Sequence, residues 1–293
     1  MLDQILTNGL VAGCFYALVA TGFGLIYSST KIFHIAYGAT YTVAAYVCYY
    51  CVSDLGWSLP SAIVTGVLGA AIVGLAMEYF VYAPLEARRA SPMVLLLSSL
   101  GLYIVLTNLV ALLAGNSTIG LRQESGSAYR LAGLILTDMQ LLQVALAVTL
   151  LPALMGLLRV TRLGRHVRAV RDDPVLGTVL GISERRTRLL VFAVGSALGG
   201  LAAILAALDT GISPNAGLSV LLVATVAVVV GGIHTLEGPL VGGLILGLVR
   251  ALVIWFLSAR WLEAVTFAVL LVFLSIRPHG VLSRRTRIEE VVP

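Results

Sequence analysis

The polar side chains that could do chemistry in this chain are few, and most lie in or beside long apolar runs. The four histidines are scattered, with no serine or cysteine nucleophile motif beside them: His34, His166, His234 and His279. Neither G-x-S-x-G nor H-E-x-x-H occurs, and the single lysine, Lys31, does not follow a glycine, which excludes a G-K-[ST] phosphate-binding loop. We therefore expect no catalytic residue, no metal site and no cofactor in this chain.

One group of residues could instead line a path for a solute across a membrane. It combines the polar aromatic start of one apolar run, hydroxyl and amide groups within another, and a glycine pair: His34, Tyr37, Gly38, Tyr41, Ser98, Ser99, Asn108, Gly231 and Gly232. Polar groups and broken helices are tolerated at membrane depth where they line a water-filled cavity. The alternatives are interfacial anchoring of the aromatic groups, interhelical hydrogen bonding and close helix packing.

Charges near the apolar runs form a second group. Arg250 falls among the apolar residues 244–256, so it needs a partner or a polar path. Glu237 and Glu78 are possible partners, and the sequence does not choose between them. Both carboxylates, like Glu263, lie at segment ends, where snorkelling to the interface is the ordinary explanation. The lack of a carboxylate deep within a run disfavours a proton- or sodium-coupled carrier.

The elements that must position these residues are membrane-spanning helices. Apolar residues make up 59% of the 293 residues, charged residues make up 11%, and the mean hydropathy is +1.00. This composition predicts an all-α polytopic membrane protein, with residues 1–293 as a single transmembrane domain. We expect eight or nine spans, one or more of them broken or re-entrant, from about nine apolar segments: 4–30, 32–53, 55–77, 90–121, 139–158, 189–208, 218–233, 239–257 and 262–276. Cys14, Cys48 and Cys51 lie in these segments and are interpreted as packing residues.

The distribution of basic residues predicts the orientation in the membrane. The loop 159–188 holds eight arginines against Asp172, Asp173 and Glu184, and 15 of the 19 basic residues fall in loops on one face. By the positive-inside rule this face is cytoplasmic, the N-terminus is outside, and residues 277–293 form a short cytoplasmic tail. The same rule accounts for the basic sequence pI near 9.3, so a nucleic-acid partner is not needed to explain it.

A short helix is predicted within the loop 159–188. Asp173 and Pro174 are typical of an N-cap and a first helical position, and Gly181 is typical of a stop, which places a helix at about 174–180. Two i, i+4 pairs give it a small apolar face: Val175 with Val179, and Leu176 with Leu180. This face is offered to a groove on a partner protein or to the lipid surface.

Five stretches in order resemble the integral membrane subunits of branched-chain amino acid ABC importers, the LivH-type permeases. Each is weak alone, but five in register are specific: Phe33-His34-Ile35-Ala36-Tyr37-Gly38 with Tyr41, Ala44, Ala45 and Tyr46; Ser99-Leu100-Gly101-Leu102 with Leu106 and Asn108; Gly164-Arg165, Arg168-Ala169, Asp173-Pro174 and Gly181-Ile182; Val230-Gly231-Gly232-Ile233 with Gly238-Pro239-Leu240-Val241-Gly242-Gly243; and Arg277-Pro278-His279-Gly280. The sequence departs from the family pattern at His34, Tyr37, Ala44, Gly177 and Glu237. The departures near the pathway leave the solute open among branched-chain or other amino acids, urea and short amides.

The resemblance implies an ABC importer permease in a bacterial inner membrane. Its partners would be a second related permease, two cytoplasmic ATPase subunits that bind ATP and Mg²⁺, and a periplasmic solute-binding protein. The helix 174–180 would be the coupling helix, with the coupling residues Gly164, Arg165, Arg168, Asp173, Pro174, Val175, Leu176, Val179, Leu180 and Gly181. The alternatives are a secondary transporter that needs no ATPase and a purely structural membrane subunit.

Overall fold

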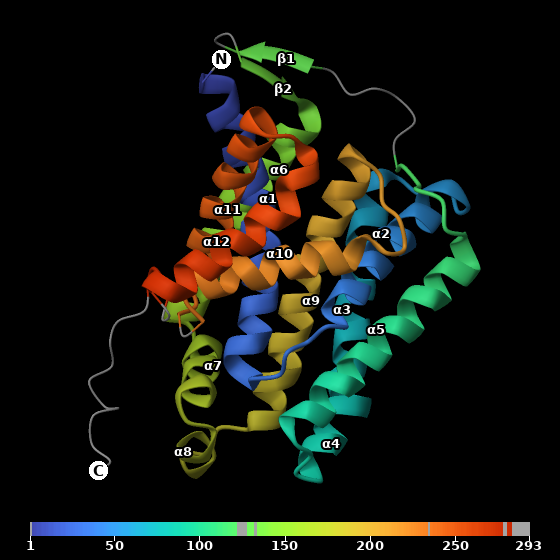
Figure 1. Ribbon diagram of the computed structural model, residues 1–293. Coiled ribbons are helices and arrows are strands. Elements are labelled where there is room, and N and C mark those ends of the chain that lie inside the picture. Colours follow the sequence, from blue (N-terminus) through green and yellow to red (C-terminus); the bar gives the residue numbers. More distant parts are fainter. Residues whose placement is uncertain (1, 122–127, 132–133, 234, 278–279, 283–293) are drawn as a thin grey trace.

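The computed structural model describes residues 2–121, 128–131, 134–233, 235–277 and 280–282. Within these ranges the chain forms a bundle of long helices (Figure 1). The helices are α1 (Leu2–Thr30), α2 (Tyr37–Ser53), α3 (Leu59–Met77), α4 (Ala83–Ala87), α5 (Pro92–Ala114), α6 (Asp138–Val160), α7 (Arg162–Asp172), α8 (Pro174–Val179), α9 (Glu184–Asp209), α10 (Ala216–Gly231), α11 (Gly238–Phe256) and α12 (Leu262–Ile276). A π-helical segment, η1 (Glu78–Tyr82), joins α3 to α4, and a short 3-10 turn, η2 (Ala259–Trp261), precedes α12.

The prediction of an all-α polytopic membrane protein is confirmed. In the described part of the chain, seven helices are long and apolar enough to cross a membrane, one of them being the continuous run Leu59–Ala87. The shorter helix α10 is also apolar, α2 lies within the second predicted segment, and the expected number of spans stays a prediction. The last three helices lie close to their predicted bounds. The loop between α5 and α6 adds a small antiparallel hairpin, β1 (Ala128–Leu131) with β2 (Leu134–Thr137), which the sequence did not indicate.

The bundle is organised around α1, which packs against α6, α9, α10 and α11. Its closest neighbour is α11, and glycine on both helices permits that approach. A Cβ on Gly247 would lie 2.1 Å from the backbone nitrogen of Gly13, and one on Gly243 would lie 2.4 Å from that of Ala17. Close contact between the two helices therefore accounts for Gly243 and Gly247, which are four residues apart on α11.

Interfacial anchoring and a broken segment were the two alternatives for the polar aromatic start of the second apolar segment, and the structure shows the broken one. α1 ends at Thr30, Lys31 adopts a φ of +58°, and residues 31–36 are not helical before α2 begins at Tyr37. The left-handed backbone conformation costs an amino acid with a side chain about 1–2 kcal/mol, so packing of the surrounding residues must hold Lys31 in it. The non-helical segment 31–36 is consequently held inside the bundle, where Ile32, His34 and Ala36 are buried.

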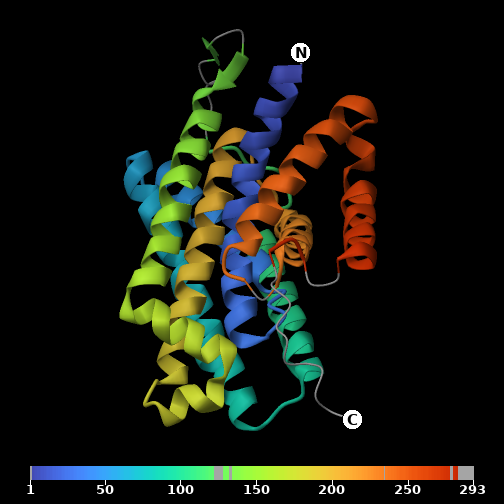
Figure 2. The same cartoon turned by 90° about the vertical axis from the view of Figure 1, so that its left-hand side faces the viewer.

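The two ends of the bundle differ. The hairpin lies beside the start of α1, where the Gln4 side chain donates to the carbonyl of Ile135 and accepts from its amide, both at 2.9 Å. At the opposite end α7 runs crosswise to α6 with α8 below it, as Figure 2 shows, and α4 lies at the same end (Figure 1). The predicted arginine-rich loop is therefore mostly helical, and most of the tail 277–293 lies outside the described residues.

Candidate functional site

The short helix α8 forms where the sequence predicts it. One Asp173 carboxylate oxygen accepts from the backbone amides of Val175 at 2.9 Å and Leu176 at 3.0 Å, which satisfies two amides that the first turn leaves free. Gly181 has a φ of +79°, as expected for a helix stop. The helix ends at Val179, with Leu180 as its C-cap.

Four apolar side chains on and beside α8 point away from the chain. The exposed fractions are 70% for Val175, 60% for Leu176, 77% for Val179 and 76% for Leu180. The opposite side is anchored, because Gly177 is buried and a Cβ there would lie 3.8 Å from Val170 on α7. α8 therefore rests on α7 through its glycine and presents an apolar face outward.

A helix that the sequence analysis missed, α7, supports α8. Its buried side contains Gly164, Val167 and Val170, while its other side carries arginines. Arg168 donates to the carbonyls of Leu158 and Arg159, the latter at 3.3 Å, and so satisfies groups left open at the end of α6. A Cβ on Gly164 would lie only 1.9 Å from the Leu158 carbonyl oxygen, so this corner requires glycine.

The predicted coupling residues thus divide into two kinds. Gly164 and Arg168 hold the α6–α7 corner, whereas Arg165 is exposed, with one long hydrogen bond of 3.5 Å to the carbonyl of Val160. The amphipathic pattern of 162–172, with apolar residues at 163, 167 and 170, is the signal that could have revealed α7.

A buried ion cluster joins α9 to the π segment at this end of the bundle. Arg188 donates through Nε to Glu78 Oε1 at 2.7 Å and through Nη2 to Glu78 Oε2 at 3.3 Å. Its Nη1 also donates to Glu86 and lies 3.8 Å from Glu184. Arg188 is 3% exposed and Glu78 only 1%. The snorkelling explanation for Glu78 is therefore wrong, and Arg188 is not a loop residue.

The other end of the π segment contacts the non-helical segment 31–36. The Tyr82 hydroxyl lies 2.8 Å from His34 Nδ1, both side chains are fully buried, and the ring of Phe192 packs against each of them. On α5, the Ser99 hydroxyl accepts from the backbone amide of Ala36 at 3.0 Å. The five residues Glu78–Tyr82 thus bind α9 at one end and the broken segment at the other.

The residues predicted to line a pathway are not gathered in one place. His34 lies within the non-helical segment 31–36, Tyr37 follows it and Ser99 is bonded to it, and the Tyr37 hydroxyl donates to the carbonyl of Val19 at 2.9 Å. Tyr41 is buried on α2, and Ser98 is half-buried on α5. Asn108 lies on the exposed side of α5, where its amide donates to the carbonyl of Ile104 at 2.8 Å.

The predicted glycines mark opposite ends of α10. Gly38 meets its start, where a Cβ would lie 2.8 Å from the carbonyl oxygen of Gly217. Gly231 and Gly232 mark its end, about 20 Å away along the helix. A Cβ on Gly231 would lie 1.8 Å from the carbonyl oxygen of Gly238, so backbone contact with the start of α11 accounts for this glycine. α10 ends at this pair, and a pathway role for all these residues stays a prediction.

Neither carboxylate considered as a partner for Arg250 contacts it. Arg250 donates to the Thr266 hydroxyl at 3.1 Å, and its guanidinium lies 5.2 Å from the centre of the Tyr16 ring. Glu237 instead accepts from Arg159, with Nε at 3.0 Å. A hydroxyl and an aromatic face therefore accommodate this charge, and both are partners that a search for opposite charges overlooks.

The described residues contain no group of three or more histidine, cysteine or acidic side chains that could hold a metal ion. Cys48 and Cys51 have the spacing of a C-x-x-C pair on α2, but both are buried and unbridged. Their environment is that of packing residues, as interpreted from the sequence.

Comparisons with known proteins agree over nearly the whole chain. A family model described as the permease component of the branched-chain amino acid transport system matches residues 5–274. The chain is 30% identical to the high-affinity branched-chain amino acid transport system permease protein LivH of Escherichia coli K12, over 96% of this chain and 95% of that protein. It is 30% identical, over the same shares, to the permease protein BraD of Pseudomonas aeruginosa.

A more distant relative is the probable branched-chain amino acid transport permease protein LivH of Methanocaldococcus jannaschii, at 27% identity over 95% of this chain and 91% of that protein. Among solved structures, a chain of PsaBC from Streptococcus pneumoniae in complex with Fab is similar, with a TM-score of 0.53 and 13% identity. That likeness covers 94% of this chain and 93% of the other, and it concerns the fold alone.

Proposed function

Because the chain belongs to the family of branched-chain amino acid transport system permease components, as a membrane permease subunit of an ABC importer, we propose that it forms half of a pathway for branched-chain or similar amino acids. The other half would be a related permease subunit. Two cytoplasmic ATPase subunits would bind ATP and Mg²⁺, and a periplasmic binding protein would deliver the solute. Urea and short amides are the competing solutes.

The observation that carries this proposal is the apolar face of α8. Val175, Leu176, Val179 and Leu180 are each at least 60% exposed, on a capped helix held by α7. Burial of each side chain in a partner's groove would contribute about 1–2 kcal/mol to the free energy of binding. The same side chains gain nothing while they are exposed to water. A groove on an ATPase subunit fits this face, and the flanking arginines would meet acidic residues at its rim.

The buried contacts supply a route from α8 to the broken segment. Residues 180–183 connect α8 to α9, and Arg188 follows within the second turn of α9. Arg188 is bound to Glu78, and Tyr82 at the other end of η1 is bound to His34. Movement of α8 by closure of the ATPases would pull on η1 and reposition the segment 31–36 as the pathway changes from outward to inward access.

The orientation is part of the same proposal. The end that carries α4, α7 and α8 would face the bacterial cytoplasm, and the hairpin beside the N-terminus would face outside. Arg88, Arg89 and most of the arginines of 159–188 belong to the first of these ends, in accord with the positive-inside rule.

Charge placed on the face of α8 tests the docking role. In the variant Val175→Asp/Val179→Asp, we expect the chain to insert into the membrane but to lose its ATPase subunits on purification in mild detergent. The matched control is Val160→Asp, because Val160 at the end of α6 is 77% exposed, as is Val179. Unchanged recovery of ATPases with the α8 variant, or equal loss with the control, would contradict the docking role.

Uptake by the whole complex in proteoliposomes tests the solute class. With the binding protein present, we expect ATP-dependent accumulation of labelled leucine, and excess unlabelled valine or isoleucine should compete. Accumulation of labelled urea or acetamide with no leucine uptake would reject amino acids as the solute while leaving the coupling role intact.

A further inference from the structure

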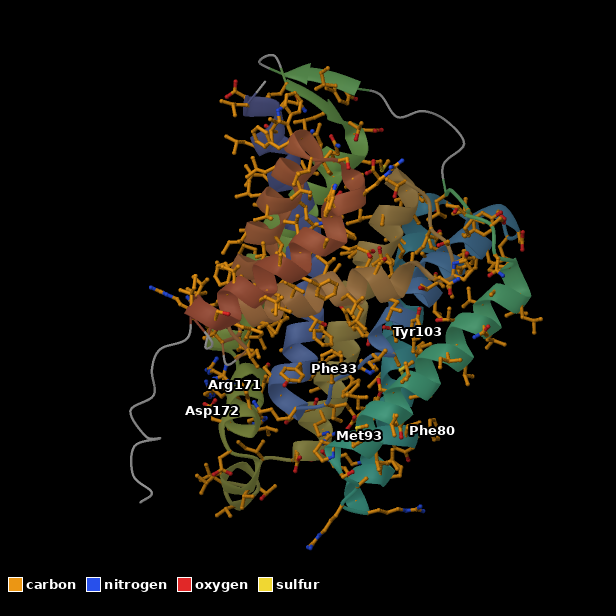
Figure 3. All side chains as sticks on the ribbon, viewed as in Figure 1. Phe33, Phe80, Met93, Tyr103, Arg171 and Asp172 are labelled. Atoms are coloured by element: carbon orange, nitrogen blue, oxygen red, sulfur yellow. The ribbon has the colours of Figure 1, made fainter. Side chains whose placement is uncertain are left out.

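A basic hollow lies between the end of α6, α7 and the connection from α10 to α11. It encloses about 380 Å³, and its charged lining comprises Arg159, Arg168, Arg171 and Glu237. Figure 3 shows Arg171 on α7 beside Asp172, with which it forms an ion pair at 2.8 Å. Three separate segments of the chain therefore converge on one concentration of guanidinium groups.

Each of these arginines keeps a donor beyond its contacts within the protein. Arg159 uses Nε and Nη2 for Glu237, Arg171 uses Nε and Nη2 for Asp172, and Arg168 uses both terminal nitrogens for backbone carbonyls. Among the described residues, Nη1 of Arg159, Nη1 of Arg171 and Nε of Arg168 have no hydrogen-bond acceptor. Guanidinium donors arranged around a hollow suit the oxygens of a phosphate group.

The charge balance favours an anion. The three arginines carry three positive charges, and their carboxylate partners Glu237 and Asp172 carry two negative charges. The net charge of about +1 is opposite to the single negative charge of a phosphodiester. Lys31, which follows α1, lies near this corner. Burial first and the positive charge of Arg171 second lower the pKa of the Lys31 amine, and Asp172 opposes that shift.

The position of the hollow distinguishes a lipid from a free ion. Arg159 lies in the last turn of α6, and the end of an apolar helix of this length falls at the boundary between hydrocarbon and water. Apart from Thr235, the remaining wall is apolar, from Met155 and Leu158 on α6 and Leu236 in the connection. Such a wall gives a free phosphate ion no contact, but it suits the glycerol and upper acyl carbons of a phospholipid.

We propose that this hollow binds one anionic phospholipid, with its phosphodiester among Arg159, Arg168 and Arg171 and its acyl chains along Met155 and Leu236. A bound lipid would brace α7, and hence the base of α8, against the connection between α10 and α11. The site does not depend on the nature of the transported solute.

Native mass spectrometry of the full chain, purified in mild detergent with whatever co-purifies, tests this proposal. The probe is phosphatidylglycerol, compared with phosphatidylcholine of the same acyl chains. We expect one retained phosphatidylglycerol, and roughly thirtyfold weaker retention in Arg159→Gln/Arg171→Gln, at about a factor of five per arginine near an anionic head group. The control Arg162→Gln/Arg186→Gln removes the same charge from exposed positions outside the hollow and should retain the lipid.

A second variant separates binding from structural support. Glu237→Gln removes the carboxylate from the hollow and should tighten retention of phosphatidylglycerol, whereas a purely structural role for its ion pair with Arg159 predicts no tightening. The proposal is overturned by equal retention of phosphatidylcholine, by equal loss in the control, by weaker retention in Glu237→Gln, or by full displacement of the lipid by millimolar inorganic phosphate, which would indicate a free-anion site.

Discussion

Replacing Arg188 with methionine should destabilise this protein more than any change at an exposed arginine. The methionine keeps much of the apolar stem but removes the guanidinium, and Glu78, only 1% exposed, loses both of its charged hydrogen bonds. Removal of one partner from a buried pair costs about 3–5 kcal/mol, because the other charge is left uncompensated. Glu86 adds little to this cost, since its side chain is 38% exposed and water replaces its partner.

Thermal unfolding in detergent, followed by tryptophan fluorescence, measures this effect. At roughly 2–4 °C for each kcal/mol in a chain of about this size, the expected fall in Tm is about 6 °C or more. The control is Arg186→Met, which makes the same chemical change two residues earlier on α9 at an exposed position. Exposed substitutions of this kind usually change stability by no more than about 0.5 kcal/mol.

A double variant decides whether the uncompensated charge is the cause. In Glu78→Gln/Arg188→Met no ionised group remains in the buried pair, so this variant should recover most of the stability lost by Arg188→Met alone. If Arg188→Met melts with the control, or if the double variant melts no higher than the single one, the reasoning from burial and charge pairing is refuted.

Three further changes have directions fixed by local geometry, each measured by the same thermal assay. Gly231→Ala should cost about 1–3 kcal/mol, because its Cβ would lie 1.8 Å from a carbonyl oxygen of α11, whereas Gly101→Ala, which meets open space, should gain up to about 1 kcal/mol of helix stability. Arg89→Gly should stabilise by about 1 kcal/mol, because Arg89 has a φ of +54° after α4, and Arg88→Gly, at a φ of −87°, should not. Tyr82→Phe leaves its buried histidine partner without that hydrogen bond and should cost about 1–3 kcal/mol, and an unchanged Tm would show that the bond contributes nothing.

The features that sequence predicted well are those set by neighbouring residues. The N-cap at Asp173 and the stop at Gly181 depend on backbone chemistry within a few positions, and both are confirmed. The apolar runs fix the long helices because a membrane leaves few other structures for uncharged segments of that length. Family resemblance added the order of the motifs but not the contacts among them.

The candidate site was harder to predict because its contacts join distant residues. Arg188 and Glu78 are 110 positions apart in the sequence, and His34 and Tyr82 are 48 positions apart. Arg250 illustrates a different difficulty, since a hydroxyl and an aromatic ring accommodate its charge where only carboxylates were considered. In both cases composition reveals the charged residue, and only the fold reveals its partner.

Glu78 shows why depth in the membrane does not identify the surroundings of a charge. The 19 residues of α3 rise about 29 Å, close to the thickness of a hydrocarbon core, so hydropathy correctly ends the apolar run just before this carboxylate. A carboxylate at that depth satisfies hydropathy equally well whether it faces lipid head groups or the interior of the protein. The distinguishing feature is that the helix does not stop: it continues through η1 to Ala87, as one run of 29 residues. A helix that continues past its first charged residue can place that charge against the protein interior. Here Glu78 is paired with the buried Arg188.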